Sequence, residues 1–469
     1  MYNVYSAIAT EFISHEEILE SLDYARKNKN NFSLAKNILE RAKNLKGLNH
    51  RDAITLLENK NKTLEQEIFL LAKNIKKKFY GNRIVLFAPL YLSNYCVNGC
   101  VYCPYCFTNK NMPRKKLTQE EIEQEVIFLQ DKGHKRLALE SGEDPINCPI
   151  EYILESIDTI YKIKHKNGAI RRVNVNIAAT EIDNYKKLKV AGIGTYILFQ
   201  ETYNKKNYER LHPTGPKHNY NYHTEAMDRA MIAGIDDVGL GVLFGLDSYK
   251  YDFVGLLMHA EHLEKKFGVG PHTISVPRIR PADNINPENF NSVPNNIFKK
   301  IIAILRIAVP YTGMIISTRE SKKMREEILN LGISQISAAS NTSVGGYYVN
   351  KKNNLAQFDI DDTRSLDEIV YWLLELNHIP SFCTACYREG RTGDKFMSLV
   401  KSKQILNCCE PNALLTLQEY LEDYALQKTK LLGEKVIADM TDQIKSQNTR
   451  ELLKKYLIDI KNGKRDFRF

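Results

Sequence analysis

Short apolar runs rich in β-branched residues recur along the middle of the chain, separated by segments in which apolar residues follow a helical period. The runs occupy 83–92, 135–142, 171–177, 195–202, 237–246, 273–279, 312–319 and 334–340. The helical segments occupy 118–132, 149–166, 180–191, 220–233, 252–266, 296–309 and 321–331. Runs of the first kind are typical of buried strands, and Thr118 with Glu121 predicts a capping box at the start of the first helix.

Eight predicted strands that alternate with seven predicted helices are typical of a complete (β/α)8 barrel. We therefore predict an α/β protein with a TIM barrel over residues 81–358. Residues 1–80 are predicted to form a helical N-terminal extension, and residues 359–469 a helical C-terminal domain around a loop with cysteines. Because the active sites of such barrels lie where the strands end, the residues that directly follow each strand are the candidates for chemistry.

Composition and charge exclude several classes of protein. No run approaches the roughly 18 to 20 apolar residues that a membrane helix needs, so we expect no membrane span. The N-terminal residues resemble neither a secretory signal nor a transit peptide, and we expect a cytoplasmic protein. The formal net charge is +10, but the lysines are spread over helical segments. Since no basic cluster alternates with aromatic residues, we predict no binding of nucleic acid.

The nine cysteines are unevenly distributed. One group lies in the stretch YCVNGCVYCPYCF and the other follows the predicted barrel; their members are Cys96, Cys100, Cys103 and Cys106, and Cys383, Cys386, Cys408 and Cys409. In a reducing cytosol disulfides are rare, so two groups of this density indicate metal centres. Cys148 stands alone and is interpreted as a packed, inert thiol.

The first group directly follows the first predicted strand. Cys96, Cys100 and Cys103 have C-x3-C-x2-C spacing, with Tyr102 before the last cysteine. Three thiolates leave one iron of a 4Fe-4S cube open, which suits a chelating small molecule. The segment therefore resembles the radical S-adenosylmethionine enzymes. A zinc site of Cys100, Cys103 and Cys106 is the alternative, but it would not explain the polar residues that follow the other strands.

Nearly the whole chain resembles one branch of these enzymes, the HydG family of tyrosine lyases in FeFe-hydrogenase maturation, with the tyrosine lyase ThiH as the next relative. The stretches that carry the resemblance are RIVLFAPLYLSNYCVNGCVYC, LESGEDP, RRVNVNIAATE, GPHTISVPRIRPAD, ISTRE and SFCTACYREGRTGDKFM. The last residue of the stretch GPHTISVPRIRPAD, Asp283, lies outside the residues that the structure describes. Cys106 departs from the family pattern and is interpreted as a bystander.

The resemblance implies the residues that bind S-adenosylmethionine and tyrosine at the first site. The residues implied for the cofactor are Tyr102, Ser141, Gly142, Glu143, Asn176, Glu201 and Arg229, and those implied for the substrate are Ser317, Thr318 and Arg319. Arg229 could pair with the methionyl carboxylate, or it could form a surface salt bridge on its own helix. The Arg319 guanidinium suits the carboxylate of tyrosine, and an ion pair with Glu320 is the alternative. Arg319 and Glu201 are the expected catalytic residues.

The second cysteine group separates the two relatives. Cys383 and Cys386 have C-x2-C spacing, and Cys409 follows after 22 intervening residues, which is similar to the auxiliary 4Fe-4S cluster of the HydG family and is absent from ThiH. The resemblance implies that the open iron binds a cysteine that bridges to a fifth, labile iron. Cys408 competes with Cys409, and a zinc site of all four thiolates stays an alternative.

His272 opens the sixth predicted strand, at the rim opposite the first cysteine group, and we propose it as a ligand of the labile iron. His259 and His262 are its competitors. The resemblance implies cleavage of the Cα–Cβ bond of L-tyrosine to p-cresol and dehydroglycine (2-iminoacetate), followed by conversion of dehydroglycine to carbon monoxide and cyanide on iron for the hydrogenase H-cluster. The implied partners are L-tyrosine, S-adenosylmethionine, cysteine, iron, a reducing ferredoxin or flavodoxin, and other maturation proteins.

Two alternatives remain for the function. A ThiH-type 2-iminoacetate synthase of thiazole (thiamine) biosynthesis would only release dehydroglycine and would not need the second cysteine group. A non-catalytic iron-sulfur scaffold would not need the polar stretches SGED, QET and STRE after the strands.

Overall fold

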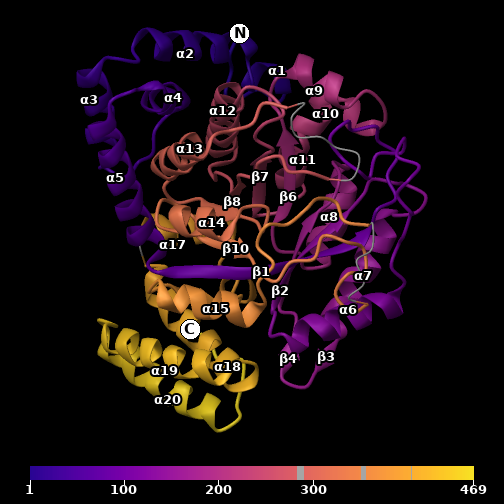
Figure 1. Cartoon of the computed structure of the whole chain (residues 1–469), viewed down its shortest axis with the longest axis vertical. Helices are drawn as coiled ribbons and strands as arrows, with labels where there is room; N and C mark the ends of the chain where they lie inside the picture. The colour runs from indigo at the N-terminus through magenta and orange to yellow at the C-terminus, as the bar shows by residue number, and fades with distance from the viewer. Residues whose placement is uncertain (283–289, 350–354, 403) are drawn as a thin grey trace.

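A closed parallel β-barrel forms the centre of the molecule (Figure 1). The computed structural model describes residues 1–282, 290–349, 355–402 and 404–469. The barrel strands are β1 (Arg83–Ser93), β2 (Arg136–Ser141), β5 (Arg172–Asn176), β6 (Tyr196–Glu201), β7 (Val238–Val242), β8 (Thr273–Ser275), β9 (Gly313–Ile316) and β10 (Gln335–Ser337). Each strand is parallel to its neighbours, and the pairing of Leu86 with Ile336 joins β1 to β10. The predicted (β/α)8 barrel is therefore confirmed.

Helices between the strands form the outer layer of the barrel. They are α6 (Gln119–Asp131), α7 (Ile150–Lys162), α8 (Ile182–Val190), α9 (Lys205–Leu211), α10 (Tyr220–Thr224), α11 (Ala226–Ile232), α12 (Tyr249–Phe267), α13 (Asn295–Ala308) and α14 (Lys322–Leu329). The capping box of α6 is present, since the Thr118 hydroxyl accepts from the Glu121 amide and the Glu121 carboxylate accepts from the Thr118 amide. The predicted helix 220–233 is instead two helices, which meet at Glu225.

A separate two-stranded hairpin and one short strand of the barrel sheet were not predicted. One is the hairpin of β3 (Lys164–His165) and β4 (Gly168–Ala169). The other is β11 (Ile379–Ser381), which pairs in parallel with the start of β1, as Val85 with Ser381. A three-residue strand that contains Pro380 gives little signal in a sequence, because proline is depleted in strands. Strand β11 brings the residues that follow it to the base of the barrel, which is the end where the strands begin.

The N-terminal helices pack against the outside of the barrel. They are α1 (Ala9–Phe12), α2 (His15–Lys27), α3 (Phe32–Ala42), α4 (His50–Glu58) and α5 (Lys62–Tyr80). In Figure 1 they run in indigo along the top and down one side of the molecule; α4 contacts α12 and α13, and α5 contacts α13. One continuous hydrophobic core extends from Ala9 to Ile460. Because the core is continuous, the predicted domain limits at residues 80 and 358 stay a prediction.

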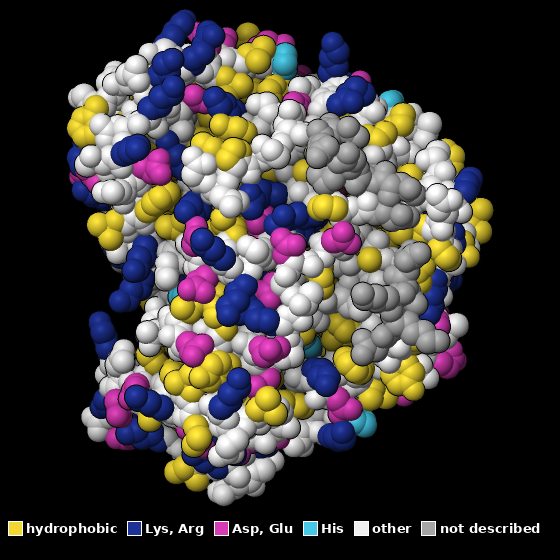
Figure 2. All heavy atoms as spheres, viewed as in Figure 1, with side chains coloured by type: hydrophobic (Ala, Val, Ile, Leu, Met, Phe, Trp, Pro, Cys, Tyr) yellow, Lys and Arg dark blue, Asp and Glu magenta, His cyan; other side chains and the backbone are white. Residues whose placement is uncertain are grey.

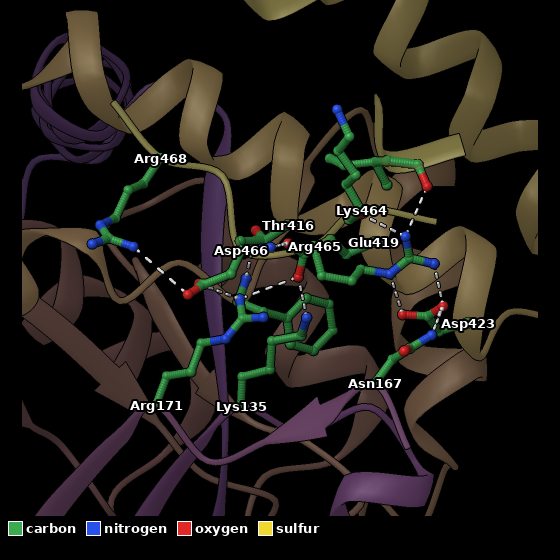
Figure 3. A network of polar contacts seen from close by, with 12 residues as sticks. Lys135, Asn167, Arg171, Thr416, Glu419, Asp423, Lys464, Arg465, Asp466 and Arg468 are labelled. Carbon is green, nitrogen blue, oxygen red and sulfur yellow. Dashed lines mark hydrogen bonds and ion pairs between the residues drawn. The ribbon is translucent and has the colours of Figure 1, made fainter. Parts of the chain in front are cut away.

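The C-terminal helices cover the base of the barrel. They are α15 (Leu366–Glu375), α16 (Ala385–Arg388), α17 (Gly393–Lys401), α18 (Leu406–Asp423), α19 (Gln427–Asp442) and α20 (Gln447–Lys461). Figure 3 shows how α18 is fastened there: the buried Glu419 carboxylate binds Lys135 and lies 3.1 Å from Nη1 of Arg171. The backbone amide of Asp466 donates to the same carboxylate at 2.6 Å. Residues 464–469 are thereby held against the barrel.

The outer surface is mixed in charge. Figure 2 shows Lys and Arg side chains scattered among Asp and Glu side chains on one face of the molecule. Among the described residues, no helix combines the length and the apolar composition needed to cross a bilayer.

Candidate active site and auxiliary metal centre

A cavity of about 240 Å³ opens at the ends of the barrel strands, and we call it the upper cavity. It brings together nearly all residues predicted for the first site. Those that line it are Cys96, Cys100, Tyr102, Cys103, Ser141, Gly142, Glu143, Asn176, Glu201, Ser317, Thr318 and Arg319. These side chains come from five different strand ends, so the closure of the barrel, rather than proximity in sequence, assembles them.

The loop with the first three cysteines lies directly against the segment that follows β2. The Val97 amide donates to the Glu143 carbonyl at 2.8 Å, and the Gly142 amide donates to the Ser93 carbonyl at 3.0 Å. A Cβ at Gly142 would lie 2.2 Å from the Tyr95 carbonyl oxygen. Only glycine fits such an approach of two backbones. The stretch SGE is thus placed beside the cysteines by backbone contacts.

The environment of the upper cavity disfavours the thiolate form of its cysteines unless a cation lies beside them. Burial, together with the charge of Cys96, raises the pKa of the Cys103 thiol to about 12. Burial also raises the pKa of Cys100 well above its usual range. Iron ions reverse this balance, because they hold coordinating sulfur in the thiolate form. Three cysteines on one cavity therefore fit a 4Fe-4S cluster with one open iron.

Cys106 takes no part in this arrangement. It does not line the upper cavity, and its sulfur lies 3.3 Å from the Thr108 hydroxyl. Within the described ranges, no three His, Cys, Asp or Glu side chains converge as ligands of a single metal ion. Cys100 and Cys103 line the upper cavity and Cys106 does not, so the cavity does not bring together the three thiols of the zinc alternative.

Glu201 reaches the cavity from an irregular strand end. The register of β6 shifts between Phe199 and Glu201, and Glu201 has a φ of 67°. Such left-handed backbone is strained for a residue other than glycine and recurs at functional sites. The Glu201 carboxylate forms an ion pair with Lys217 at 2.8 Å. Although burial opposes its charge, Glu201 and the nearby thiolates raise the pKa of Lys217, which keeps the ammonium charged.

The aromatic Tyr102 forms part of the cavity wall. Its hydroxyl lies 2.8 Å from Nε2 of His212, and the two rings pack edge to face. Burial lowers the pKa of His212 to about 2, so this ring is neutral. Nδ1 of His212 donates to the Tyr208 carbonyl. In the neutral ring Nε2 therefore has no proton and accepts from the Tyr102 hydroxyl.

Arg319 points into the upper cavity without an ionic partner. Its guanidinium carbon lies 3.3 Å from the centre of the Phe358 ring. Glu320, the expected competitor, is buried and forms ion pairs with Arg278 and Arg280 instead. In the part of the chain that the structure describes, the Arg319 guanidinium makes no hydrogen bond or ion pair, which leaves it available to an anionic ligand.

A second cavity, of about 70 Å³, lies at the base of the barrel, and we call it the lower cavity. It is lined by Cys383, Cys386, Cys409 and His272, together with the guanidinium groups of Arg83, Arg136 and Arg391. Cys408 does not line it, although its sulfur lies 3.8 Å from Nη1 of Arg391. The structure thus places Cys409, rather than Cys408, beside Cys383 and Cys386.

The environment of the lower thiols favours a metal-binding thiolate. A hydrogen bond from the Cys386 thiol and the positive charges of Arg83 and Arg391 lower the pKa of Cys409 to about 6. Burial and the neighbouring Cys409 raise the pKa of Cys383 to about 11. Three cysteine sulfurs and three arginines line the same cavity, and this set of side chains fits a second, anionic iron-sulfur cluster by the chemistry of the donors.

His272 is held between two polar side chains. Its Nδ1 lies 3.2 Å from the Asp237 carboxylate, and its Nε2 lies 3.0 Å from the Tyr387 hydroxyl. Its predicted competitors serve other contacts: His259 binds the Tyr203 hydroxyl at 3.0 Å, and His262 lies 3.1 Å from Asp228. Only His272 of the three lines the lower cavity.

Comparison with known proteins gives the family. The model of the radical SAM superfamily matches residues 90–257, and that of the Biotin and Thiamin Synthesis associated domain matches residues 275–379. A crystal structure of HydG, a maturase of the FeFe-hydrogenase, is 58% identical and covers 98% of this chain and 100% of its own, with a TM-score of 0.95. The chain belongs to the HydG family. It is therefore a radical S-adenosylmethionine enzyme, with S-adenosylmethionine and a 4Fe-4S cluster as cofactors.

Two further proteins are similar to this chain over most of their length. The HydG of Carboxydothermus hydrogenoformans is 38% identical over 96% of this chain and 99% of its own, with a TM-score of 0.84. The 2-iminoacetate synthase of Salmonella typhimurium is 30% identical over 327 residues, which are 70% of this chain and 84% of the relative.

Arg229 is the one predicted residue of the first site that does not line the upper cavity. Its guanidinium donates to the Thr180 carbonyl at 3.0 Å and to the Tyr222 carbonyl at 2.6 Å, and it packs on the Tyr222 ring. It forms neither the predicted contact in the cavity nor a salt bridge on its helix. Arg229 instead links the segment after β5 to α10, because it donates to the carbonyl groups of Thr180 and Tyr222 and packs on the Tyr222 ring.

Lys217 and Asn98 belong to the first site but were not predicted from the sequence. Asn98 donates to the Glu143 carboxylate at 2.6 Å and accepts from the Lys217 amide at 2.9 Å, so it links the cysteine loop to the segment with Lys217. Lys217 lies in LHPTGPKHNY, a stretch without a recognisable chemical motif. Its role becomes visible only when the ion pair with Glu201 is seen.

Proposed function

We propose that this member of the HydG family cleaves the Cα–Cβ bond of L-tyrosine to p-cresol and dehydroglycine and converts dehydroglycine to carbon monoxide and cyanide bound to iron. The product would serve the assembly of the FeFe-hydrogenase H-cluster. One observation carries the proposal: a single barrel has a cysteine-lined cavity at each end. The similarity to a 2-iminoacetate synthase and to HydG maturases supports the two halves of the reaction.

At the upper cavity, Cys96, Cys100 and Cys103 would hold the 4Fe-4S cluster. When bound, this cluster and S-adenosylmethionine supply the 5'-deoxyadenosyl radical that takes a hydrogen atom from tyrosine. The segment Ser141–Glu143 lies against the cysteine loop and offers backbone groups and a carboxylate to the methionyl amine. The charged Lys217, held by Glu201, is placed to bind the methionyl carboxylate.

The substrate would bind between the cofactor and the β9 end of the barrel. The guanidinium of Arg319, which has no ionic partner among the described residues, suits the carboxylate of tyrosine, with Ser317 and Thr318 beside it. Apolar side chains such as Phe87, Leu198 and Phe199 also line the cavity. They exclude water, which protects dehydroglycine from hydrolysis and keeps a reactive intermediate in place.

At the lower cavity, Cys383, Cys386 and Cys409 would hold the auxiliary 4Fe-4S cluster, with a bound cysteine and a fifth, labile iron. Nδ1 of His272 lies 3.2 Å from the Asp237 carboxylate, so Nε2 would be the metal-binding atom of a carboxylate–histidine–metal arrangement. The Tyr387 hydroxyl now contacts Nε2 and would give up this contact to iron.

The second candidate function is a 2-iminoacetate synthase that releases dehydroglycine without further conversion, which the 30% identical relative favours. An anaerobic assay of the reconstituted enzyme with L-tyrosine, S-adenosylmethionine and a reductant separates the candidates. We expect both p-cresol and cyanide. Formation of p-cresol alone would favour the synthase, and the absence of both products would refute the tyrosine lyase.

A further inference from the structure

A carboxyl group that the proposed reaction does not use lies inside the barrel. Glu140 of β2 pairs in register with Tyr91 of β1 and with Asn176 of β5. Paired residues of a parallel sheet point to the same face, and all three side chains line the upper cavity. Glu140 precedes the Ser141–Glu143 segment and is one layer deeper in the barrel.

The Glu140 carboxyl group has too few partners for an ion. Asn176 donates from Nδ2 to Oε2 of Glu140 at 2.7 Å. Across the described residues, this is its only hydrogen bond, and no cationic side chain lies within ion-pair distance. Burial raises the pKa of Glu140 to about 8, against the lowering effects of Asn176 and Arg319. Glu140 is half-buried at the cavity wall, where an ionised carboxylate normally has a cation beside it, and among the described residues it has none.

Arg319 presents the complementary situation in the same cavity. Arg319 is a half-buried cation that lines the cavity and packs on Phe358, and it has no anionic partner within the described part of the chain. Arg319 and Glu140 are close enough to influence each other's pKa, but they form no ion pair. A ligand with a carboxylate and an ammonium on one carbon would satisfy both groups at once.

We propose that Glu140 binds the α-ammonium group of the amino-acid substrate while Arg319 binds its α-carboxylate. The upper cavity then recognises its substrate as a zwitterion, and the aromatic side chain extends toward the apolar wall. This inference rests on the proposed tyrosine lyase function and adds the residue that selects an amino acid over an organic acid of the same shape.

The test compares two ligands that differ only in the amino group. L-tyrosine and 3-(4-hydroxyphenyl)propanoate are titrated anaerobically into the reconstituted enzyme with S-adenosylmethionine bound. We expect the wild-type enzyme to bind L-tyrosine at least tenfold more tightly than the analogue, because only tyrosine offers Glu140 a cation. Equal affinities of the wild-type enzyme for the two ligands would overturn the proposal without the need of any variant.

Glu140→Gln sharpens the test, because glutamine keeps the shape of the side chain and can still accept from Asn176. We expect this variant to lose at least tenfold in affinity for L-tyrosine and to bind the analogue as the wild type does. Arg319→Lys is the matched control and should weaken both ligands, since both carry the carboxylate. An equal loss for both ligands in Glu140→Gln, or no loss for either, would contradict the inference.

Two measurements distinguish a failure of the role of Glu140 from a failure of the proposed tyrosine lyase function. The iron content and the thermal unfolding midpoint of Glu140→Gln should match the wild type, which excludes a general loss of structure. If the wild-type enzyme bound no L-tyrosine and formed no p-cresol, the proposed function itself would fail. If the wild type formed p-cresol and Glu140→Gln bound tyrosine normally, only the role of Glu140 would be refuted.

Discussion

The upper and lower cavities are each lined by three cysteines, which different parts of the chain bring together. The upper cysteines come from one short loop after β1, Cys96 to Cys103. Cys383 follows β11, Cys386 lies in α16 and Cys409 lies in α18, and His272, which directly precedes β8, lines the same cavity. The first site is therefore a local structure, whereas the second exists only when the C-terminal helices have docked on the barrel.

The two cavities also differ in charge. Acidic and basic side chains are mixed at the upper cavity, where Glu140, Glu143 and Glu201 face Lys217 and Arg319. Arg83, Arg136 and Arg391 line the lower cavity, and its described lining residues include no carboxylate. Such a cationic site favours anions, which suits the carboxylate of dehydroglycine and cyanide. The difference in charge is consistent with the proposed division of the barrel, in which the upper cavity would bind zwitterionic tyrosine and the lower cavity anionic products.

The largest effect is expected when the upper donor set is broken. Cys100→Ser should abolish p-cresol formation, by more than a hundredfold, because the radical chemistry depends on the first cluster. Cys106→Ser is the matched control, since Cys106 lies in the same loop but outside the cavity. Product analysis checks both variants. Full activity in Cys100→Ser, or inactivity in Cys106→Ser, would mean that the ligands are assigned wrongly.

A large but selective effect is expected at the lower donor set. Replacement of Cys383 and Cys386 together should leave p-cresol formation within about threefold of the wild type and abolish cyanide and carbon monoxide. Cys409→Ser should remove the second cluster and Cys408→Ser should not, because only Cys409 lines the lower cavity. Iron and sulfide analysis with cyanide assays checks these variants. A parallel loss of p-cresol would show that the two cavities do not work independently.

An intermediate effect is expected from pH. With a pKa of about 8, Glu140 ionises as the pH rises, and only the carboxylate attracts the tyrosine ammonium. The affinity for L-tyrosine should therefore increase about fivefold from pH 7 to pH 8, by the change in ionised fraction. Tyr91, Tyr105, Asn176 and Arg319 face Glu140 from the surrounding elements, and none of the neutral ones titrates in this range.

Titration of the holoenzyme with L-tyrosine at both pH values measures this effect, and the analogue without the amino group serves as the control. The same change with the analogue, or an affinity that falls as the pH rises, would argue against ionisation of Glu140 as the cause.

The smallest effect on activity, although a clear one on stability, is expected at the base of the barrel. Glu419→Gln leaves Lys135 and Arg171 without their shared carboxylate (Figure 3) and should lower the free energy of unfolding by about 3 kcal/mol. Arg468→Ala removes an exposed ion pair with Glu389 and should change it by less than about 0.5 kcal/mol. Denaturant unfolding compares the two, and equal losses would show that α18 is not anchored through Glu419.

Much of the fold followed from the periodicity of the chain. All eight barrel strands and the capping box of α6 occur where the pattern predicted them. Strand β11 escaped prediction because it is short and contains Pro380, and the break at Glu225 left no mark in the helical period. These errors concern elements whose existence depends on partners far away in the sequence.

The candidate site was predicted unevenly for a similar reason. Positions 96, 100 and 103 and the residues after the strands follow from spacing and from the rule that strand ends share one rim. Lys217, Asn98 and Glu140 carry no motif, and their importance depends on which side chains face them. The role proposed for Arg229 placed it in the cavity, whereas nearby carbonyl groups hold it in the wall.

By itself, the sequence determined the barrel, the two groups of cysteines and the end of the barrel where the first group lies, because hydrophobic period and ligand spacing act over a few residues. Only the tertiary structure decided that Cys409 rather than Cys408 faces the lower cavity, that Glu201 pairs with Lys217, and that Glu140 and Arg319 share a cavity without pairing. Such relations depend on strand register and on the docking of distant helices, which fix distances between side chains that spacing along the chain leaves open.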